Sequence, residues 1–262
     1  MSLKLNHQHF GQAGRPALVI LHGLMGFARN WTVAAKRLAE DFEVFVLDMR
    51  NHGSSPHDPV MSYEAMAEDV HAFLQANNLS GAILLGHSMG GKAAMAFACK
   101  YPDLIQGLVV ADISPKTYEP HYTQELNALN ALDVASFKTR VEAEAAVAQA
   151  IPAEDLRKFL LSNLVRCQEG GFMWQCNLPV LVDALPAIEH NSLKEGDRYK
   201  GPTLFIRGKH SNFMEDSDES VIKTYFPQAT ITLLEDAGHN VHVEGLESFL
   251  EAVRTFISQP TL

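Results

Sequence analysis

Gly86-His87-Ser88-Met89-Gly90-Gly91 is the stretch of this sequence that decides the fold. It follows the apolar run GAILL and opens the helical pattern KAAMAFACK, so a strand, a sharp turn and a helix are expected in that order. This is the G-x-S-x-G pattern in the context that gives it chemical meaning. A tight strand-to-helix turn crowds the backbone, which explains the flanking glycines, and it holds Ser88 exposed in a strained conformation. The stretch therefore predicts a nucleophilic serine.

Short β-rich runs alternate with longer helical patterns along most of the chain. The predicted strands are Lys4–His9, Ala17–His22, Glu43–Asp48, Gly81–His87, Gly107–Asp112, Thr203–Arg207 and Thr230–Glu235. Several of them are apolar without alternation, which is typical of strands buried on both faces. Amphipathic helices are predicted at Trp31–Glu40, Ser62–Ala76, Met89–Lys100 and Leu246–Ser258. The pattern indicates an α/β fold, with a mostly parallel central sheet flanked by helices.

The alternation of strands and helices breaks between about Ser114 and Lys200. This part of the chain is helix-rich and strand-poor. We expect residues 115–200 to form a helical cap, or lid, inserted into a core made of residues 1–114 and 201–262.

An oxyanion needs two N–H donors aimed at the point where negative charge develops. The backbone N–H of Met89, at the start of a helix, is the first candidate. The second is the N–H of Leu24, in the glycine-containing loop His22–Gly26 that follows the strand ALVIL. The neighbouring residues expected to contact substrate are His22, Gly23 and His87.

The general base is expected near the C-terminus, because enzymes with this elbow place Ser, acid and His in that order. His239 lies in the sequence Ala-Gly-His, after the strand TITLLE and before the final helix. His242, three residues later, is the alternative.

The acid has more than one candidate. The usual loop, after the strand TLFIR, carries Ser211 where an Asp is common. Asp112 ends the strand that follows the nucleophile helix, and a buried carboxylate there needs a hydrogen-bond partner that His239 could supply. Asp216 and Asp218 remain alternatives, although both fit the beginning of a helix.

The composition limits the class of protein. The chain has 262 residues and a net charge of −10, so nothing favours nucleic acid or an anionic membrane as partner. No signal peptide or membrane span is apparent, and the three cysteines lack metal-ligand spacing. A cytoplasmic protein without metal or organic cofactor is expected, and its oligomeric state stays open.

Five motifs in register carry a family resemblance: VILHGLMG, DMRNHGSSP, GHSMGGKAAM, VVADISP and AGHNVH. Over essentially its full length the chain resembles the α/β-hydrolases, and more narrowly the bacterial esterases of the YbfF type and their abhydrolase relatives. The resemblance implies that the acid is displaced to Asp112. It also implies that Asp48 and Arg50 are structural.

The motifs together predict a serine carboxylesterase that hydrolyses short- to medium-chain acyl esters through Ser88, His239 and Asp112. Acyl-CoA thioesters and carbon–carbon bonds are alternative targets of the same residues. A hydrolase-fold protein that only binds a small molecule is the alternative from another class. Cap residues that could line an acyl pocket are Leu126, Leu129, Phe159, Leu160, Phe172 and Trp174.

Overall fold

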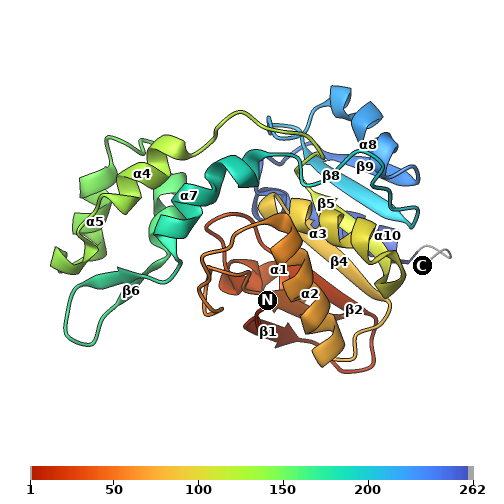
Figure 1. The fold of residues 1–262 in the computed structure, drawn as a ribbon, viewed down its shortest axis with the longest axis horizontal. Helices are drawn as coiled ribbons and strands as arrows, with labels where there is room; N and C mark the ends of the chain where they lie inside the picture. The colour runs from red at the N-terminus through yellow and green to blue at the C-terminus, as the bar shows by residue number, and fades with distance from the viewer. Residues whose placement is uncertain (1, 259–262) are drawn as a thin grey trace.

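A seven-stranded sheet forms the centre of the protein, whose computed structural model describes residues 2–258 (Figure 1). The strands are β1 (His7–Phe10), β2 (Ala17–Leu21), β3 (Glu43–Leu47), β4 (Ala82–His87), β5 (Ile105–Ala111), β8 (Thr203–Gly208) and β9 (Ala229–Leu234). They lie in the order β1-β3-β2-β4-β5-β8-β9, and every neighbouring pair except β1–β3 is parallel. The predicted α/β fold is confirmed, and the strand ends differ from the prediction by at most three residues.

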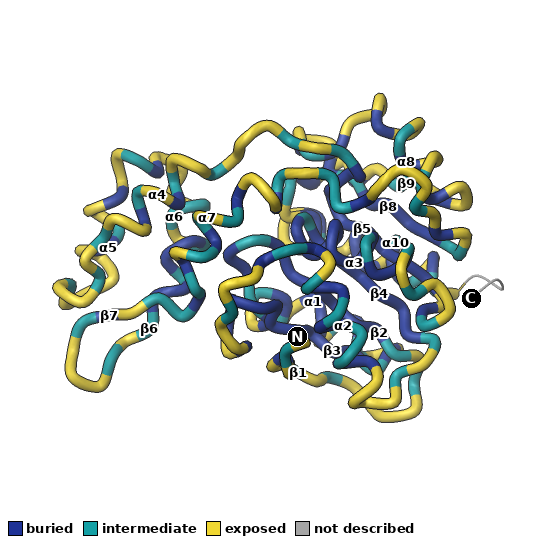
Figure 2. Tube along the Cα trace, viewed as in Figure 1, coloured by how far each residue is buried: buried dark blue, intermediate teal, exposed yellow. Residues whose placement is uncertain are grey.

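Alternate side chains of the central strands enter two separate cores. Val19 and Leu21 of β2 belong to the core that includes α2 (Tyr63–Ala76), α3 (Met89–Lys100) and α8 (Glu219–Tyr225). Leu18 and Ile20 belong to the core under α1 (Thr32–Leu38) and α10 (Leu246–Ile257). Helices therefore cover both faces of the sheet, which is why its inner strands are apolar without alternation and lie buried in Figure 2.

Most of residues 115–200 lie to one side of the sheet, towards the left of Figure 1. Their helices are α4 (Thr123–Asn130), α5 (Arg140–Val147), α6 (Glu154–Leu161) and α7 (Leu178–Glu189), with the 3₁₀ helix η3 (Val134–Ser136) between α4 and α5. A hairpin of β6 (Leu164–Arg166) and β7 (Phe172–Trp174) was not predicted. Its turn uses Gly171 at φ +71°, where a Cβ would lie 2.2 Å from the Ala135 carbonyl oxygen. Buried leucines join this segment to the core that contains α2 and α3.

The remaining short elements are the 3₁₀ helices η1 (Ala28–Trp31), η2 (Pro102–Leu104) and η4 (Asp216–Asp218), and the one-turn helix α9 (Val241–Glu244). Three loops follow the carboxyl ends of β2, β4 and β5, and two more follow β8 and β9. Because these strands are parallel, all five loops meet at one edge of the sheet. Every residue predicted to take part in chemistry lies in or beside them.

Candidate active site

Ser88 lies at the tip of the turn between β4 and α3, with φ +53° and ψ −120°. A non-glycine residue with this backbone conformation costs about 1–3 kcal/mol, so the surrounding structure must enforce it. The flanking glycines permit the tight turn. A Cβ on Gly86 would lie 2.2 Å from the Gly90 carbonyl oxygen, and one on Gly90 would lie 2.4 Å from the Leu21 carbonyl oxygen. The turn therefore has the geometry expected from the sequence.

Asp112 directly follows β5 and is completely buried. Its own backbone has φ +52°, which turns the side chain towards the loops after β8 and β9. Oδ1 accepts the Gly208 N–H at 2.9 Å, and Oδ2 accepts from the Ser211 hydroxyl and from Nδ1 of His239, the latter at 2.8 Å. Three donors thus satisfy a carboxylate that burial would otherwise destabilise.

His239 is fixed in position by three contacts. Its Nδ1–H donates to Asp112, so Nε2 is the nitrogen left to accept a proton. Its carbonyl oxygen lies 2.9 Å from Nε2 of His87. The Phe213 ring stacks on its imidazole, with centroids 3.8 Å apart.

The alternative acids are engaged elsewhere. The Asp216 side chain is 97% exposed and pairs with Arg207. Asp218 forms an ion pair with Lys116 at 2.7 Å and accepts the Glu215 N–H. The structure brings neither carboxylate to His239, but it does bring Asp112.

Ser211, which takes the place of the usual aspartate, donates its hydroxyl to that displaced carboxylate. The position is visible in the sequence, but this contact is not. The only signal was the loop position itself, because the two residues lie 99 positions apart.

His242, the alternative base, is buried and stacks on Trp31 with ring centroids 3.8 Å apart. Burial, together with the smaller effect of the neighbouring His239, lowers its pKa to about 3. The ring is therefore neutral and packed against a hydrophobic side chain. Nδ1 of His242 has no hydrogen-bond partner among residues 2–258, whereas His239 has Asp112.

Two further buried histidines join the loops after β2 and β3. His22 donates from Nδ1 to the Gly23 carbonyl oxygen at 2.8 Å, and its Nε2 accepts the Met49 N–H at 3.0 Å. His52 donates from Nδ1 to the Arg50 carbonyl oxygen, and its Nε2 accepts the Met25 N–H at 3.1 Å. Both rings must be neutral to accept these bonds. Burial accordingly lowers the pKa of His22 to about 4 and that of His52 to about 3.

These bonds decide which N–H groups of the loop after β2 are free. The Met25 N–H is bonded to His52, and the Gly26 N–H donates to the Gly23 carbonyl oxygen at 3.0 Å. Within residues 2–258, the N–H groups of Leu24 and Met89 have no acceptor. The two predicted oxyanion donors are thus unpaired.

A cavity of about 460 Å³ lies beside Ser88 and His239. It is lined by Ser88, His239, Leu24, His22, Gly23 and His87, together with residues of α4 and α6. From the 115–200 segment, Leu126, Phe159 and Leu160 line it. Leu129 and Phe172 are instead buried in the core, and Trp174 packs against it; none of these three lines the cavity.

Among residues 2–258, no three His, Cys, Asp or Glu side chains cluster as ligands for a metal ion. None of the helices in that range is both long and apolar enough to cross a membrane.

Comparisons with known proteins agree with the motifs. The family model described as "alpha/beta hydrolase fold" matches residues 16–177. The chain is 37% identical to Esterase YbfF of Escherichia coli (strain K12) over 248 residues, covering 94% of this chain and 95% of that protein. It is 38% identical to the sn-1-specific diacylglycerol lipase ABHD11 of Mus musculus, covering 95% and 83%. A solved structure of a marine microorganism esterase superposes with a TM-score of 0.94 at 36% identity, covering 97% and 100%.

Proposed function

The chain belongs to the α/β-hydrolase fold family and is a hydrolase that acts on ester bonds, and from this premise we propose that it is a serine carboxylesterase with Ser88 as nucleophile, His239 as base and Asp112 as acid. One observation carries the proposal. The strained elbow presents Ser88 to the same cavity as His239, whose other ring nitrogen is held by a buried carboxylate 2.8 Å away.

The reaction begins when Nε2 of His239 takes the proton of the Ser88 hydroxyl as its oxygen attacks the ester carbonyl. The carbonyl oxygen becomes negative and is stabilised by the free N–H groups of Leu24 and Met89. His239 then gives its proton to the departing alkoxide, which leaves an acyl-enzyme on Ser88. Water, activated by the same imidazole, hydrolyses that ester and regenerates the serine.

Asp112 supports the reaction by holding His239 in the reactive tautomer and by stabilising the imidazolium that forms. Gly208 and Ser211 also donate to this buried carboxylate and so hold it in one orientation. Ser211 is therefore a positioning residue in this proposal.

Residues 115–200 act as a cap over the site in this proposal. Helices α4 and α6 supply Leu126 and Phe159 to the cavity wall. Asn163, which follows α6, donates to the Met25 carbonyl oxygen at 2.8 Å and so attaches the cap to the loop that carries Leu24. The apolar wall suits the hydrocarbon part of short- to medium-chain acyl esters.

The test is hydrolysis of p-nitrophenyl esters from acetate to laurate by the wild type and by Ser88→Ala. We expect the substitution to lower kcat by at least roughly 10⁴-fold. Ser217→Ala, at an exposed position of η4, is the matched control and should match the wild type. A folded wild type that hydrolyses no ester in the series would contradict the proposal. That result would favour hydrolysis of thioesters or of carbon–carbon bonds, or ligand binding without turnover.

A further inference from the structure

Ser88 lies where two cavities meet. The larger, of about 460 Å³, is the one described above. A second chamber, of about 50 Å³, also reaches Ser88 and is lined by residues of α2, α3 and α7 and of the loops after β2, β5 and β8. The two cavities share Leu24, Ser88 and Tyr122 and no other residue. Each part of an ester, on either side of its carbonyl group, therefore has its own space.

The position of His239 decides which part goes where. His239 lines the large cavity but not the small chamber. The base must protonate the departing alkoxide, so the alkoxy group has to lie on the side of the imidazole. Met89, one of the two oxyanion donors, lines the small chamber. We propose, building on the esterase function above, that the small chamber binds the acyl group and the large cavity binds the alcohol, so that the natural substrates are short-acyl esters of bulky alcohols.

The volume of the chamber limits the acyl chain. A void of about 10–15 Å³ holds one water-sized group, so a chamber of about 50 Å³ accepts roughly three to five carbon atoms beyond the carbonyl. Most of its wall is apolar and is formed by Ile113, Tyr118, Leu185, Ile188 and Phe213, and the polar residues Lys92, His121 and Glu189 also line it. An apolar chamber of this size favours a short hydrocarbon chain.

Hydrogen bonds hold the wall of the chamber in place. The Tyr118 hydroxyl donates to the Phe213 carbonyl oxygen at 2.6 Å and accepts the Ser114 N–H at 2.8 Å. Lys92 of α3 is 1% exposed, and its ammonium donates to the carbonyl oxygens of Glu189 and His190 at 2.9 and 2.7 Å. These bonds fasten the end of α7 to the nucleophile helix. The chamber therefore cannot widen for a longer acyl chain without breaking buried polar contacts.

The test uses two substrate series with the full-length wild type. In the first series, p-nitrophenyl esters vary the acyl group from acetate to octanoate. In the second, acetate esters carry alcohols of increasing length, and acid release is followed by pH-stat. We expect kcat/KM to fall at least roughly tenfold between butyrate and octanoate, because the longer chain overfills the chamber. In the second series it should hold or rise with length.

Two leucine-to-alanine variants test the assignment of each cavity. Leu185→Ala enlarges the small chamber, so the ratio of octanoate to butyrate kcat/KM should rise by roughly tenfold. Leu156→Ala is the matched control from the large cavity, and there this ratio should equal that of the wild type. Thermal unfolding checks that both variants fold. If Leu185→Ala does not fold, the two wild-type substrate series still test the proposal.

The outcomes separate this proposal from the esterase function. Ester turnover that depends on Ser88 but is equal for butyrate and octanoate would overturn the acyl-chamber assignment and leave the esterase function standing. If the ratio of octanoate to butyrate kcat/KM changed in Leu156→Ala and not in Leu185→Ala, the acyl group would bind in the large cavity and the alcohol in the small chamber. The absence of any ester turnover would remove both proposals.

Discussion

Asp112 receives donors from three parts of the chain that are far apart in the sequence. Gly208 and Ser211 belong to the loop after β8, and His239 belongs to the loop after β9. A buried carboxylate with three donors is held in a single orientation, and it transmits that orientation to the His239 ring. In the proposed function, Asp112 at the end of β5 therefore takes the place of an aspartate in the loop after β8, where Ser211 contacts its carboxylate.

Replacing Asp112 with Asn tests this assignment. The amide cannot stabilise an imidazolium, and it permits the wrong histidine tautomer, so kcat should fall by about 10³–10⁴-fold. The measurement is kcat for p-nitrophenyl acetate, with circular dichroism to check folding. Asp216→Asn is the control, because its exposed side chain pairs with Arg207 and not with His239 among residues 2–258, and it should retain activity. Equal losses in the two variants would contradict the assignment.

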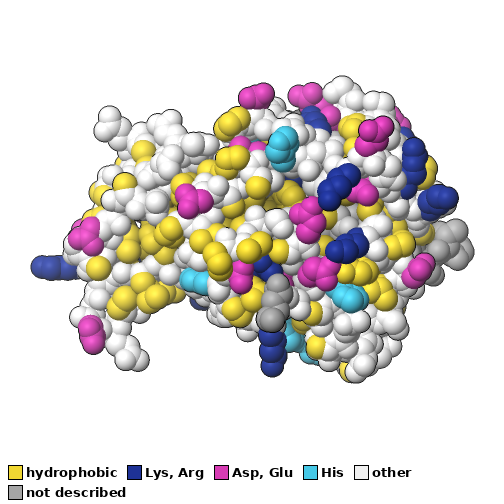
Figure 3. All heavy atoms as spheres, in the orientation of Figure 1, with side chains coloured by type: hydrophobic (Ala, Val, Ile, Leu, Met, Phe, Trp, Pro, Cys, Tyr) yellow, Lys and Arg dark blue, Asp and Glu magenta, His cyan; other side chains and the backbone are white. Residues whose placement is uncertain are grey.

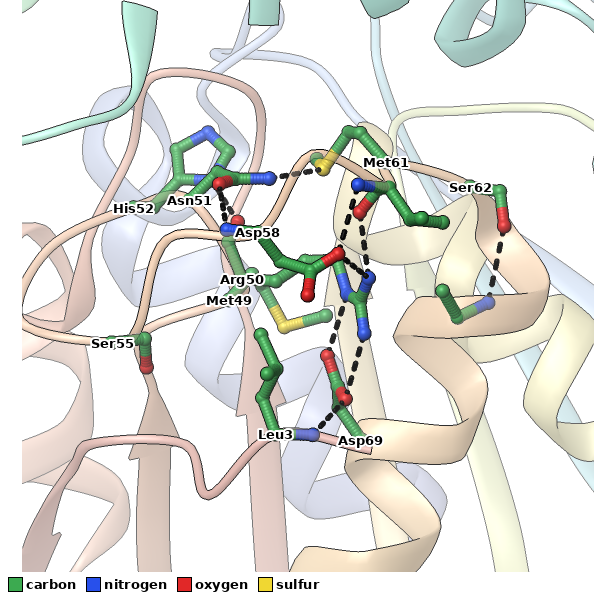
Figure 4. A network of polar contacts seen from close by, with 12 residues as sticks. Leu3, Met49, Arg50, Asn51, His52, Ser55, Asp58, Met61, Ser62 and Asp69 are labelled. Atoms are coloured by element: carbon green, nitrogen blue, oxygen red, sulfur yellow. Dashed lines mark hydrogen bonds and ion pairs between the residues drawn. The ribbon is translucent and has the colours of Figure 1, made fainter. Parts of the chain in front are cut away.

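The loop after β3 contacts the loop that carries Leu24 and holds it in place. Its Arg50 is buried and forms a bidentate ion pair with Asp69 of α2, at 2.7 and 3.0 Å (Figure 4). A third donor reaches the Val60 carbonyl oxygen at 2.6 Å. The same loop carries His52, which holds the Met25 N–H. Arg50 thus fixes a loop that in turn shapes the one bearing Leu24.

Replacing Arg50 with Met should lower the free energy of unfolding by about 3–5 kcal/mol, because it leaves the Asp69 carboxylate buried without its cation. The urea midpoint and its slope measure the change. Arg37→Met is the matched control: Arg37 pairs with Glu247 at 2.8 Å, but both side chains are exposed. Its midpoint should shift much less, and an equally large shift would show that burial is not the deciding factor.

The elements of the sheet could be predicted because each carries a local signal. LVIL, VFVL and AILL are apolar runs with turn residues at their ends, and they became β2, β3 and β4. The cap carries weaker signals. Its hairpin has strands of only three residues each, and the helix-rich stretch before it forms two short helices, α4 and α5, with η3 between them. Short strands depend on tertiary contacts that sequence periodicity does not report.

The residues of the candidate site also fall into those with a local sequence signal and those without one. Ser88 and His239 stand in motifs whose neighbours in sequence explain them, so they could be located directly. Ser211, Phe213 and Lys92 act through contacts between distant segments. Nothing near them in the sequence indicates those contacts. Sequence patterns thus indicated the candidate groups, whereas the packing that orients them required the fold.

At the scale of the whole molecule, the protein combines a net charge of −10 with a core that contains neutral histidines. Acidic and basic side chains are interspersed on the face seen in Figure 3. His22, His52 and His242 are buried, and burial lowers their pKa values to about 4, 3 and 3. A proton on Nε2 of His22 or His52 would break the hydrogen bond that this nitrogen accepts. A proton on His242 would bury a charge against the Trp31 ring.

Stability should therefore depend on pH between 7.5 and 5.5. The folded pKa of these histidines lies below the unfolded value of about 6.5, so the unfolded chain binds protons first as the pH falls. The stabilisation is complete above about pH 6.5 and is lost progressively below it. Because of these three rings, the free energy of unfolding should be about 4 kcal/mol lower at pH 5.5 than at pH 7.5. Urea unfolding at the two pH values measures this, and equal stabilities would contradict the neutral, buried assignment.

The central claim is that Ser88 is a nucleophile activated by His239 and Asp112, and labelling tests it most directly. The wild type would be treated with a fluorophosphonate, which reacts with activated serines, and the modified peptide would be located by mass spectrometry. We predict one adduct, on Ser88, which forms much more slowly in Asp112→Asn and is absent in Ser88→Ala. An adduct on another serine, or a folded wild type that takes up no label, would contradict the claim.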